Sequence, residues 1–130
     1  MNVLVLEAST TSAKAMYYHT EDQSFEVKVK NYTGNYEDVT IHNAEHVYED
    51  MMAVGRELLA GRPVDMIALS GTWHSLVLCD KGMTPVTPVY LWSYTGAACV
   101  CKPLREDSQY VRAYYQKTGC MVNAIYPFFK

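Results

Sequence analysis

Residues 3–18 read VLVLEASTTSAKAMYY: an apolar run that ends at an acid, four consecutive hydroxyl residues, and a second extended run. Residues 2–7 are mostly aliphatic, which is typical of a strand buried on both faces. Residues 14–20 are expected to form a second strand that returns beside the first. The hydroxyl residues 9–12 between them predict either a plain turn or a loop that wraps a phosphate.

The segments that follow extend this hairpin into a mixed sheet. Residues 25–32 alternate apolar and charged side chains, which predicts a strand near the sheet edge with one solvent-exposed face. Apolar residues then recur at helical spacing over about 42–60, so an amphipathic helix is expected there. Residues 64–71 form a nearly continuous apolar strand, expected to be central and parallel to the first. The fold class is therefore α/β, with an antiparallel three-strand meander and flanking helices.

The C-terminal half is expected to hold a hairpin and a helical region. Two short extended pieces, 75–80 and 87–92, flank a turn. A helical region is expected over about 97–117, with Pro103 marking a break or a late start. Ser93 or Thr95 is the expected N-cap of that helix.

Composition excludes several functional classes. The chain has 130 residues, 49% of them hydrophobic, and a net charge of -3, so no basic surface indicates nucleic acid or acidic lipid as a partner. No apolar stretch approaches the roughly 20 residues of a membrane helix, and no secretory signal is visible. The four cysteines are expected to be reduced thiols in the cytoplasm. Cys99 and Cys101 match no zinc pattern, and His42 and His46 are interpreted as a solvated helix face.

The hydroxyl-rich turn has the groups that bind a nucleotide phosphate. Hydroxyls of Thr10, Thr11 and Ser12 are donors for phosphate oxygens, and Lys14 adds a positive charge just after the turn. Glu7, at the end of the first strand, is a candidate ligand for a magnesium ion, directly or through water. The alternative to a phosphate site is a plain Ser/Thr-rich hairpin with a surface lysine.

A second candidate site follows the strand expected at 64–71. Ligands in open α/β sheets bind beyond the carboxyl ends of strands, where this sequence places Trp73 and His74. An indole offers a flat apolar surface for the face of a sugar ring, and an imidazole hydrogen-bonds hydroxyls. The alternative is a core tryptophan beside a strand-end histidine. Residues 91–96 are a candidate second wall of the same pocket.

Three stretches taken together resemble the N-terminal part of the FGGY-type carbohydrate kinases. They are LVLEASTTSAKAM, ALSGTWHSLVLCDKGMTPVTPVYLWSYTGAA and YYQKTGCMVNAIYPFFK, and their order and spacing cover nearly the whole chain. The middle stretch looks most like the gluconokinase and xylulokinase branches. The resemblance implies a ribonuclease H-like domain of the actin-like ATPase type. It also implies ATP, Mg²⁺ and a sugar or sugar acid as ligands.

The resemblance also implies roles for individual residues. The ATP phosphate loop would contain Thr10, Thr11 and Ser12 followed by Lys14, and Glu7 would stand at the position of the magnesium-associated acid. The sugar site would be lined by Trp73, His74, Ile125 and Tyr126.

This sequence departs from the family pattern at several of these positions. Glu7 replaces an Asp, and Ser9 replaces a loop glycine, which would strain the turn if that position needs a positive φ. Thr72 replaces a Gln, while Tyr94 and Gly96 replace an Asp and an Arg. These changes keep open an alternative function, a non-catalytic ribonuclease H-like binding or regulatory module.

The resemblance further implies that residues 1–130 are one domain of a longer kinase. The catalytic base and the adenosine-binding motifs of the family lie in later sequence, so no catalytic residue is assigned here and the fragment alone is expected to be inactive. Its expected partners are the sugar substrate and its own C-terminal domain. An apolar surface near residues 120–130 is expected to favour self-association, for example as a homodimer.

Overall fold

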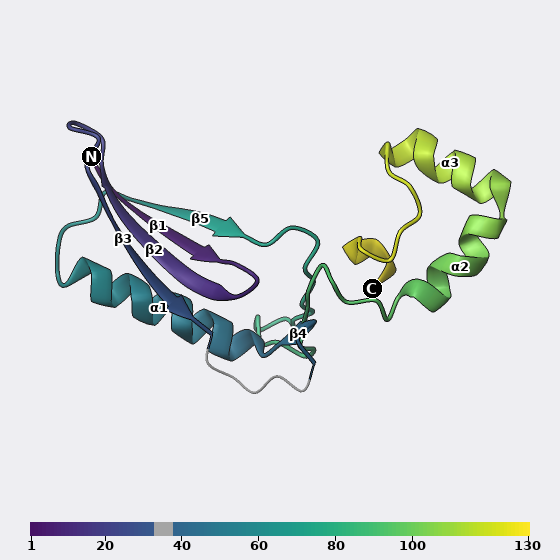
Figure 1. Cartoon of the computed structure of the whole chain (residues 1–130), viewed down its shortest axis with the longest axis horizontal. Coiled ribbons are helices and arrows are strands. Elements are labelled where there is room, and N and C mark those ends of the chain that lie inside the picture. The colour runs from purple at the N-terminus through teal and green to yellow at the C-terminus, as the bar shows by residue number, and fades with distance from the viewer. Residues whose placement is uncertain (33–37) are drawn as a thin grey trace.

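A four-stranded mixed sheet forms the N-terminal half of the protein (Figure 1). The computed structural model describes residues 1–32 and 38–130. The strand order is β3-β2-β1-β5, with β1, β2 and β3 antiparallel and β5 parallel to β1. The strands are β1 (Asn2–Ala8), β2 (Ser12–His19), β3 (Phe25–Asn31) and β5 (Met66–Gly71). The predicted meander and the parallel pairing are thus confirmed.

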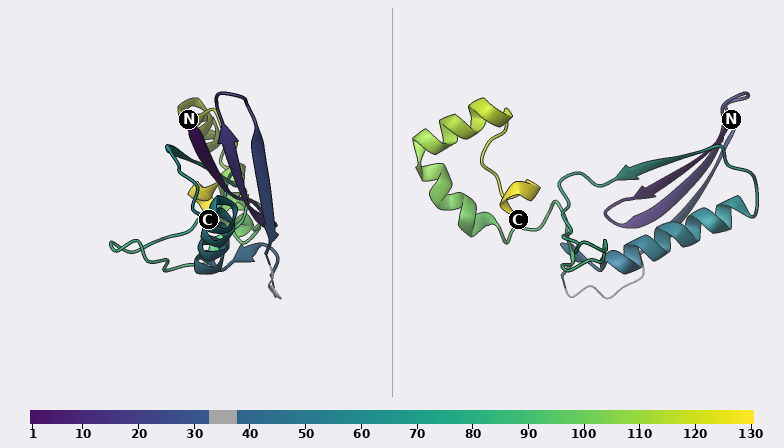
Figure 2. Two further views of the ribbon diagram at one scale, coloured as in Figure 1. Left: turned by 90° about the vertical axis from the view of Figure 1, so that its left-hand side faces the viewer. Right: turned by 180° about the vertical axis from the view of Figure 1, so that it is seen from behind.

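The helix expected between the meander and β5 is α1 (Ala44–Leu59). It begins where the Asn43 side chain accepts a hydrogen bond from the His46 amide at 3.0 Å. It ends at Ala60, which adopts a left-handed conformation. Figure 2 shows that α1 lies along one face of the sheet, which it packs against through β1, β2 and β3.

The main core fills the space between α1 and this face of the sheet. Alternate residues of β1 and β2 point towards α1, and Gly55 allows the helix to approach closely, because a Cβ there would lie 2.7 Å from Leu6 Cδ2. The buried residues of this cluster are Leu4, Leu6, Ala13, Ala15, Tyr17, Val54 and Leu58. Burial of this apolar surface holds the helix on the sheet.

Strand β3 lies at the sheet edge as predicted, but its apolar side does not face the core. Register pairs Ala15 with Lys28, so the charged residues of β3 share the face covered by α1. They form ion pairs with the helix and its C-terminal turn: Lys28 with Glu57, Lys30 with Asp50 at 2.5 Å, and Glu26 with Arg62 at 2.6 Å. Phe25, Val27 and Val29 are exposed on the opposite face. The expected edge position and the single solvent-exposed face are thus observed, and the exposed face is the apolar one.

Strand β5 was expected at the centre of the sheet, and this expectation is also wrong for the described residues. It is an edge strand, paired only with β1 there. Its apolar side chains Met66, Ile67 and Leu69 are exposed, since α1 covers the other three strands. Met121 and Phe128 are exposed as well, and the self-association expected near residues 120–130 stays a prediction.

A hairpin and a short second sheet follow β5. Leu76 and Tyr90 exchange backbone hydrogen bonds of 2.9 and 2.8 Å, and Asp80 Oδ1 accepts from the amides of Gly82 and Thr84 in the turn. Strand β6 (Val89–Tyr90) pairs with β4 (Ile41–His42). The expected hairpin is confirmed, with shorter regular strands than the sequence predicts.

The C-terminal helical region is two helices, α2 (Ala98–Glu106) and α3 (Ser108–Thr118), followed by a turn of 3₁₀ helix at Pro127–Phe129. The break is at Asp107, whose carboxylate caps α3, whereas Pro103 lies inside α2. No side chain caps α2, so the prediction for Ser93 or Thr95 is wrong. A second core of Ala97, Cys101, Val122, Ala124 and Phe129 holds this part together.

His42 was predicted on a solvated helix face, but the structure places it in β4 with 5% of its surface exposed. Its ring lies edge-on to Tyr32 with centroids 5.3 Å apart. The imidazole of His42 is therefore buried and not solvated. None of the helices in the described ranges is long and apolar enough to span a membrane.

The burial of His42 predicts a pH dependence of stability. Burial lowers the pKa of the imidazole from its ordinary value of 6.5, because the charged form loses hydration. The unfolded chain then binds the proton more readily, so the contribution to stability is complete above about pH 6.5 and is lost as the pH falls below it. His42→Phe is expected to reduce the difference in unfolding free energy between about pH 7.5 and pH 5.5 in urea titrations. His46→Ala is the control, and equal slopes for the two variants would contradict the prediction.

Candidate functional site

The candidate site begins where β1 and β5 end side by side. Because the two strands are parallel, their carboxyl ends lie at the same edge of the sheet, with Ala8 in register with Gly71. The Thr72 hydroxyl donates to the Ala8 carbonyl at 3.1 Å and fastens the loop after β5 to the end of β1. The two predicted sites, the hydroxyl-rich turn and the Trp73–His74 loop, are therefore neighbours.

The turn between β1 and β2 is held by its first and last residues. The Ser9 amide and hydroxyl both donate to the Ser12 carbonyl, at 3.0 and 2.8 Å. Ser9 has no positive φ, so the serine in place of a glycine does not strain the backbone. Ser12 is the first residue of β2 and only 4% exposed, with its hydroxyl 3.1 Å from that of Ser9. Thr10 and Thr11 form the outer part of the turn.

Glu7 and Lys14 lie opposite each other on β1 and β2. Lys14 Nζ is 3.3 Å from both carboxylate oxygens of Glu7. Both side chains remain about one-third exposed, so this long ion pair is in contact with solvent and contributes little to stability. The pair places one cation and one carboxylate at the base of the hydroxyl-rich turn.

Trp73 and His74 follow β5 in an exposed loop. The Trp73 indole is 82% exposed, so the core-tryptophan alternative does not hold. His74 has a φ of 61°, in the left-handed region that non-glycine residues rarely adopt. Its ring contacts Trp73 and Tyr126 edge-on, at centroid distances of 5.8 and 5.0 Å. The loop thus presents an open aromatic surface beside the C-terminal segment.

Two further side chains join the remaining segments to this site. Trp92 Nε1 donates to Thr10 Oγ1 at 3.3 Å, which links residues 91–96 to the hydroxyl-rich turn. Lys130 Nζ donates to the carbonyls of His74 and Leu91, both at 2.6 Å. Sequence reasoning placed residues 91–96 at the pocket wall but assigned no role to Lys130, because a lysine near an aromatic run has no local signal for such contacts.

The substitutions at positions 94 and 96 fit each other. A Cβ at Gly96 would lie 2.2 Å from the Tyr94 hydroxyl, so the tyrosine ring occupies the space that a side chain at position 96 would need. The ring also packs against Tyr90, with centroids 4.7 Å apart. Tyr94 and Gly96 therefore depend on each other, because the tyrosine ring fits only where position 96 has no side chain.

Ile125 and Tyr126 lie in the turn before the final 3₁₀ helix. The Ile125 amide donates to Asn123 Oδ1 at 3.1 Å, and the Tyr126 amide donates to the Asn123 carbonyl. Both side chains are half-buried. The contact of Tyr126 with His74 brings this turn to the aromatic surface.

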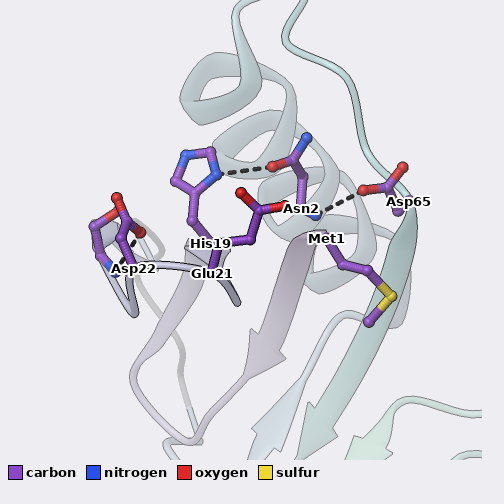
Figure 3. A pocket seen from close by; sticks show the side chains of 7 residues that line it. Met1, Asn2, His19, Glu21, Asp22 and Asp65 are labelled. Carbon is purple, nitrogen blue, oxygen red and sulfur yellow. Dashed lines mark hydrogen bonds between the residues drawn. The ribbon is translucent and has the colours of Figure 1, made fainter.

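A separate hollow of about 380 Å³ lies at the other end of the sheet (Figure 3). It is lined by Met1, Asn2, His19, Glu21, Asp22, Ser24 and Asp65. His19 Nδ1 is 2.7 Å from Asn2 Oδ1, and the Asn2 amide donates to Asp65 at 2.7 Å. These polar groups bond one another at the amino end of β1, away from the strand ends where α/β sheets bind ligands.

Glu7 is the candidate metal ligand of the site. The described residues contain no group of three His, Cys, Asp or Glu side chains that could hold a metal. Cys99 and Cys101 are free thiols, and burial raises the pKa of Cys101. Magnesium ions in nucleotide sites are bound by one or two carboxylates together with phosphates, and the exposed Glu7 carboxylate fits such a role.

Comparison with known proteins gives one consistent set of relatives. Residues 2–130 match the model of the N-terminal domain of the FGGY family of carbohydrate kinases. A glycerol kinase from Francisella tularensis subsp. holarctica (strain LVS) is 24% identical over 132 residues, which is 95% of this chain and 26% of the relative. The chain therefore spans about a quarter of the length of the curated relatives it matches.

Solved structures share the fold at low sequence identity. A gluconate kinase from Lactobacillus acidophilus superimposes with a TM-score of 0.83 at 16% identity, over 99% of this chain and 27% of that one. A glycerol kinase from Plasmodium falciparum, solved with ADP, has a TM-score of 0.82 at 16% identity. The match covers 98% of this chain and 27% of that one. The ribonuclease H-like, actin-like ATPase fold is thereby confirmed. The chain belongs to the FGGY family of carbohydrate kinases, and its residues 2–130 match the N-terminal domain of that family.

Proposed function

We propose that the protein containing this chain transfers the γ-phosphate of ATP to a hydroxyl of a sugar or sugar acid, of the gluconate or ketopentose kind. The observation that carries the proposal is the junction of the two loops. The Trp92 indole donates a hydrogen bond to the Thr10 hydroxyl at 3.3 Å, and the Thr72 hydroxyl donates to the Ala8 carbonyl at 3.1 Å. A phosphate held at the turn would therefore lie next to a sugar held at Trp73. Phosphoryl transfer depends on such positioning of donor and acceptor.

The phosphate side of the site is assigned to the β1–β2 turn. Thr10 and Thr11 offer hydroxyls from its outer part, and Lys14 supplies a positive charge. Ser12 can contribute only by exchanging its contact with Ser9 for the phosphate. Glu7 would hold Mg²⁺, directly or through water, which when bound neutralises charge on the phosphates. Because Lys14 contacts Glu7 in this structure, a phosphate and Mg²⁺ bound there would compete with this ion pair.

The sugar side is assigned to the aromatic surface. Trp73 is exposed enough to stack on the face of a sugar ring, and His74 and Tyr126 are close enough to bind the hydroxyls at its edge. Ile125 would close the pocket from the same turn as Tyr126. These groups bind and orient the acceptor, and none of them is assigned the role of catalytic base.

The proposal also covers the partners of this chain and the cellular compartment. The remaining three-quarters of a family member would supply the catalytic base and the adenosine site, so this chain's partner is its own C-terminal domain. We place the reaction in the cytoplasm, with no nucleic acid or membrane partner, in keeping with a net charge of -3. A homodimer through exposed apolar surface is part of the same proposal.

The direct test is a substrate screen of the full-length protein. ADP release is measured with gluconate, xylulose, ribulose and glycerol, each in the presence of ATP and Mg²⁺. Turnover of one of these compounds supports the proposal, and Trp73→Ala should then raise the KM for that compound more than the KM for ATP. ATP binding without turnover of any compound would refute it and favour the non-catalytic regulatory module.

A further inference from the structure

Lys130 connects two segments of the site through backbone carbonyls. Its Nζ lies 2.6 Å from the His74 carbonyl and 2.6 Å from the Leu91 carbonyl. Residues 74 and 91 flank the hairpin that runs out from the site and back. One ammonium group therefore fixes the two ends of this hairpin to the C-terminal segment.

The chemistry of these contacts requires a cation with several donors. Carbonyl oxygens only accept hydrogen bonds, so two of them can share one group only if it donates twice. An ammonium does so, and hydrogen bonds from a charged donor are stronger than neutral ones. Within the part of the chain that the structure describes, Lys130 forms no ion pair. Burial lowers the pKa of its amine, which agrees with a cation partly withdrawn from water.

The backbone at His74 is the part of this arrangement that needs support. A φ of 61° is unfavourable for a residue with a Cβ and persists only where surrounding contacts enforce it. The carbonyl of this same residue is bound by Lys130, and its ring is bound by Tyr126. Both contacts come from the C-terminal segment, which thus holds His74 from two sides.

We propose that Lys130 is a positioning residue of the sugar site, which holds His74 in its left-handed conformation by binding its carbonyl together with that of Leu91. The orientation of the Trp73 and His74 rings follows from that backbone conformation. Lys130 also keeps Leu91, and with it Trp92, beside the hydroxyl-rich turn. The effect on catalysis rests on the proposed kinase function, whereas the effect on the loop does not.

The first test measures the loop itself, by amide hydrogen exchange of the full-length protein followed on peptides covering residues 72–78. Lys130→Met is expected to speed exchange there by about tenfold or more, since two charge-assisted bonds are lost. Lys130→Arg, which can still donate to two carbonyls, should restore most of the protection. Lys102→Met, which removes an exposed lysine of α2, is the control for loss of charge. Unchanged exchange in Lys130→Met would overturn the proposal.

A double-mutant comparison isolates the backbone effect. Asparagine tolerates the left-handed region better than histidine, so Lys130→Met should cost less protection in a His74→Asn background. Met83→Asn is the matched control, because Met83 also has a positive φ, 65°, but lies in the far turn of the hairpin. An equal cost in both backgrounds would show that Lys130 does not hold the His74 backbone, and the proposal would fall.

The second test reads the site through catalysis. Displacing the acceptor by about 1 Å costs roughly 100-fold in rate, so Lys130→Met should lower kcat/KM for the sugar by a factor of that order. The KM for ATP should change little, and Lys130→Arg should recover part of the loss. Equal losses for sugar and ATP without recovery by arginine would contradict a positioning role. If no sugar is turned over, the kinase proposal fails while the exchange experiment still decides the role of Lys130.

Discussion

Tyr17→Ala is expected to lower the free energy of unfolding by about 3–5 kcal/mol, the range for truncation of a large aromatic core residue. Tyr17 is 1% exposed and packs in the core between the sheet and α1. Its hydroxyl donates to the Pro63 carbonyl at 2.7 Å, and the Arg62 guanidinium lies 4.3 Å from its ring centroid. The alanine variant loses all three contributions together: the packing of the ring, the hydrogen bond to the Pro63 carbonyl and the cation–π contact with Arg62.

Two variants separate these contributions in urea unfolding at a constant pH. Tyr17→Phe keeps the ring and should cost only about 1 kcal/mol, the usual net value of one hydrogen bond. Tyr115→Ala removes an exposed tyrosine of α3 and should cost less than about 0.5 kcal/mol. A loss for Tyr17→Ala as small as that for Tyr17→Phe would show that the sheet and α1 repack without this ring.

If the full-length protein has the proposed kinase activity, Lys14→Met is expected to lower its kcat by about 100- to 1,000-fold. Removing one charge or donor aimed at the reacting group costs about this much when the charge acts in the transition state. Lys14 is the cation at the base of the hydroxyl-rich turn, where it lies opposite Glu7. The KM for the sugar should change little, because Trp73 and His74 lie on a different loop.

The matched control is Lys28→Met, which removes a lysine from the same sheet. Lys28 lies on the opposite face and pairs with Glu57 of α1, so its loss should leave kcat within about twofold and affect stability only slightly. Steady-state assays of ADP release at saturating sugar measure both variants. Comparable kcat values for Lys14→Met and the wild type would contradict the assignment of Lys14 to the phosphate site.

The elements nearest the site could be predicted from the sequence because their signals are local. Aliphatic runs marked β1 and β5, the hydroxyl residues marked the turn between β1 and β2, and apolar spacing marked α1. A helix between two strands implies a parallel pairing, which brings the turn and the Trp73–His74 loop to one sheet edge. The family pattern added the roles proposed for these residues.

The face that each strand presents could not be predicted in this way. Alternation in β3 separates charged from apolar residues, but the register with β2 decides which set lies beside α1. Ion pairs with Asp50 and Glu57 then satisfy the charged set, so the apolar set is exposed. His42 was misplaced for a similar reason, because its burial comes from pairing between β4 and β6 rather than from helical spacing.

By itself the sequence determined the α/β class, the meander, the parallel strand and the position of the hydroxyl-rich turn, since each depends on neighbours along the chain. Only the tertiary structure decided how that turn is connected. Glu7 meets Lys14, Trp92 meets Thr10, and Lys130 binds the carbonyls of two distant residues. Such contacts depend on side-chain geometry between segments that are far apart in the chain. A local pattern of residue types therefore cannot predict these contacts.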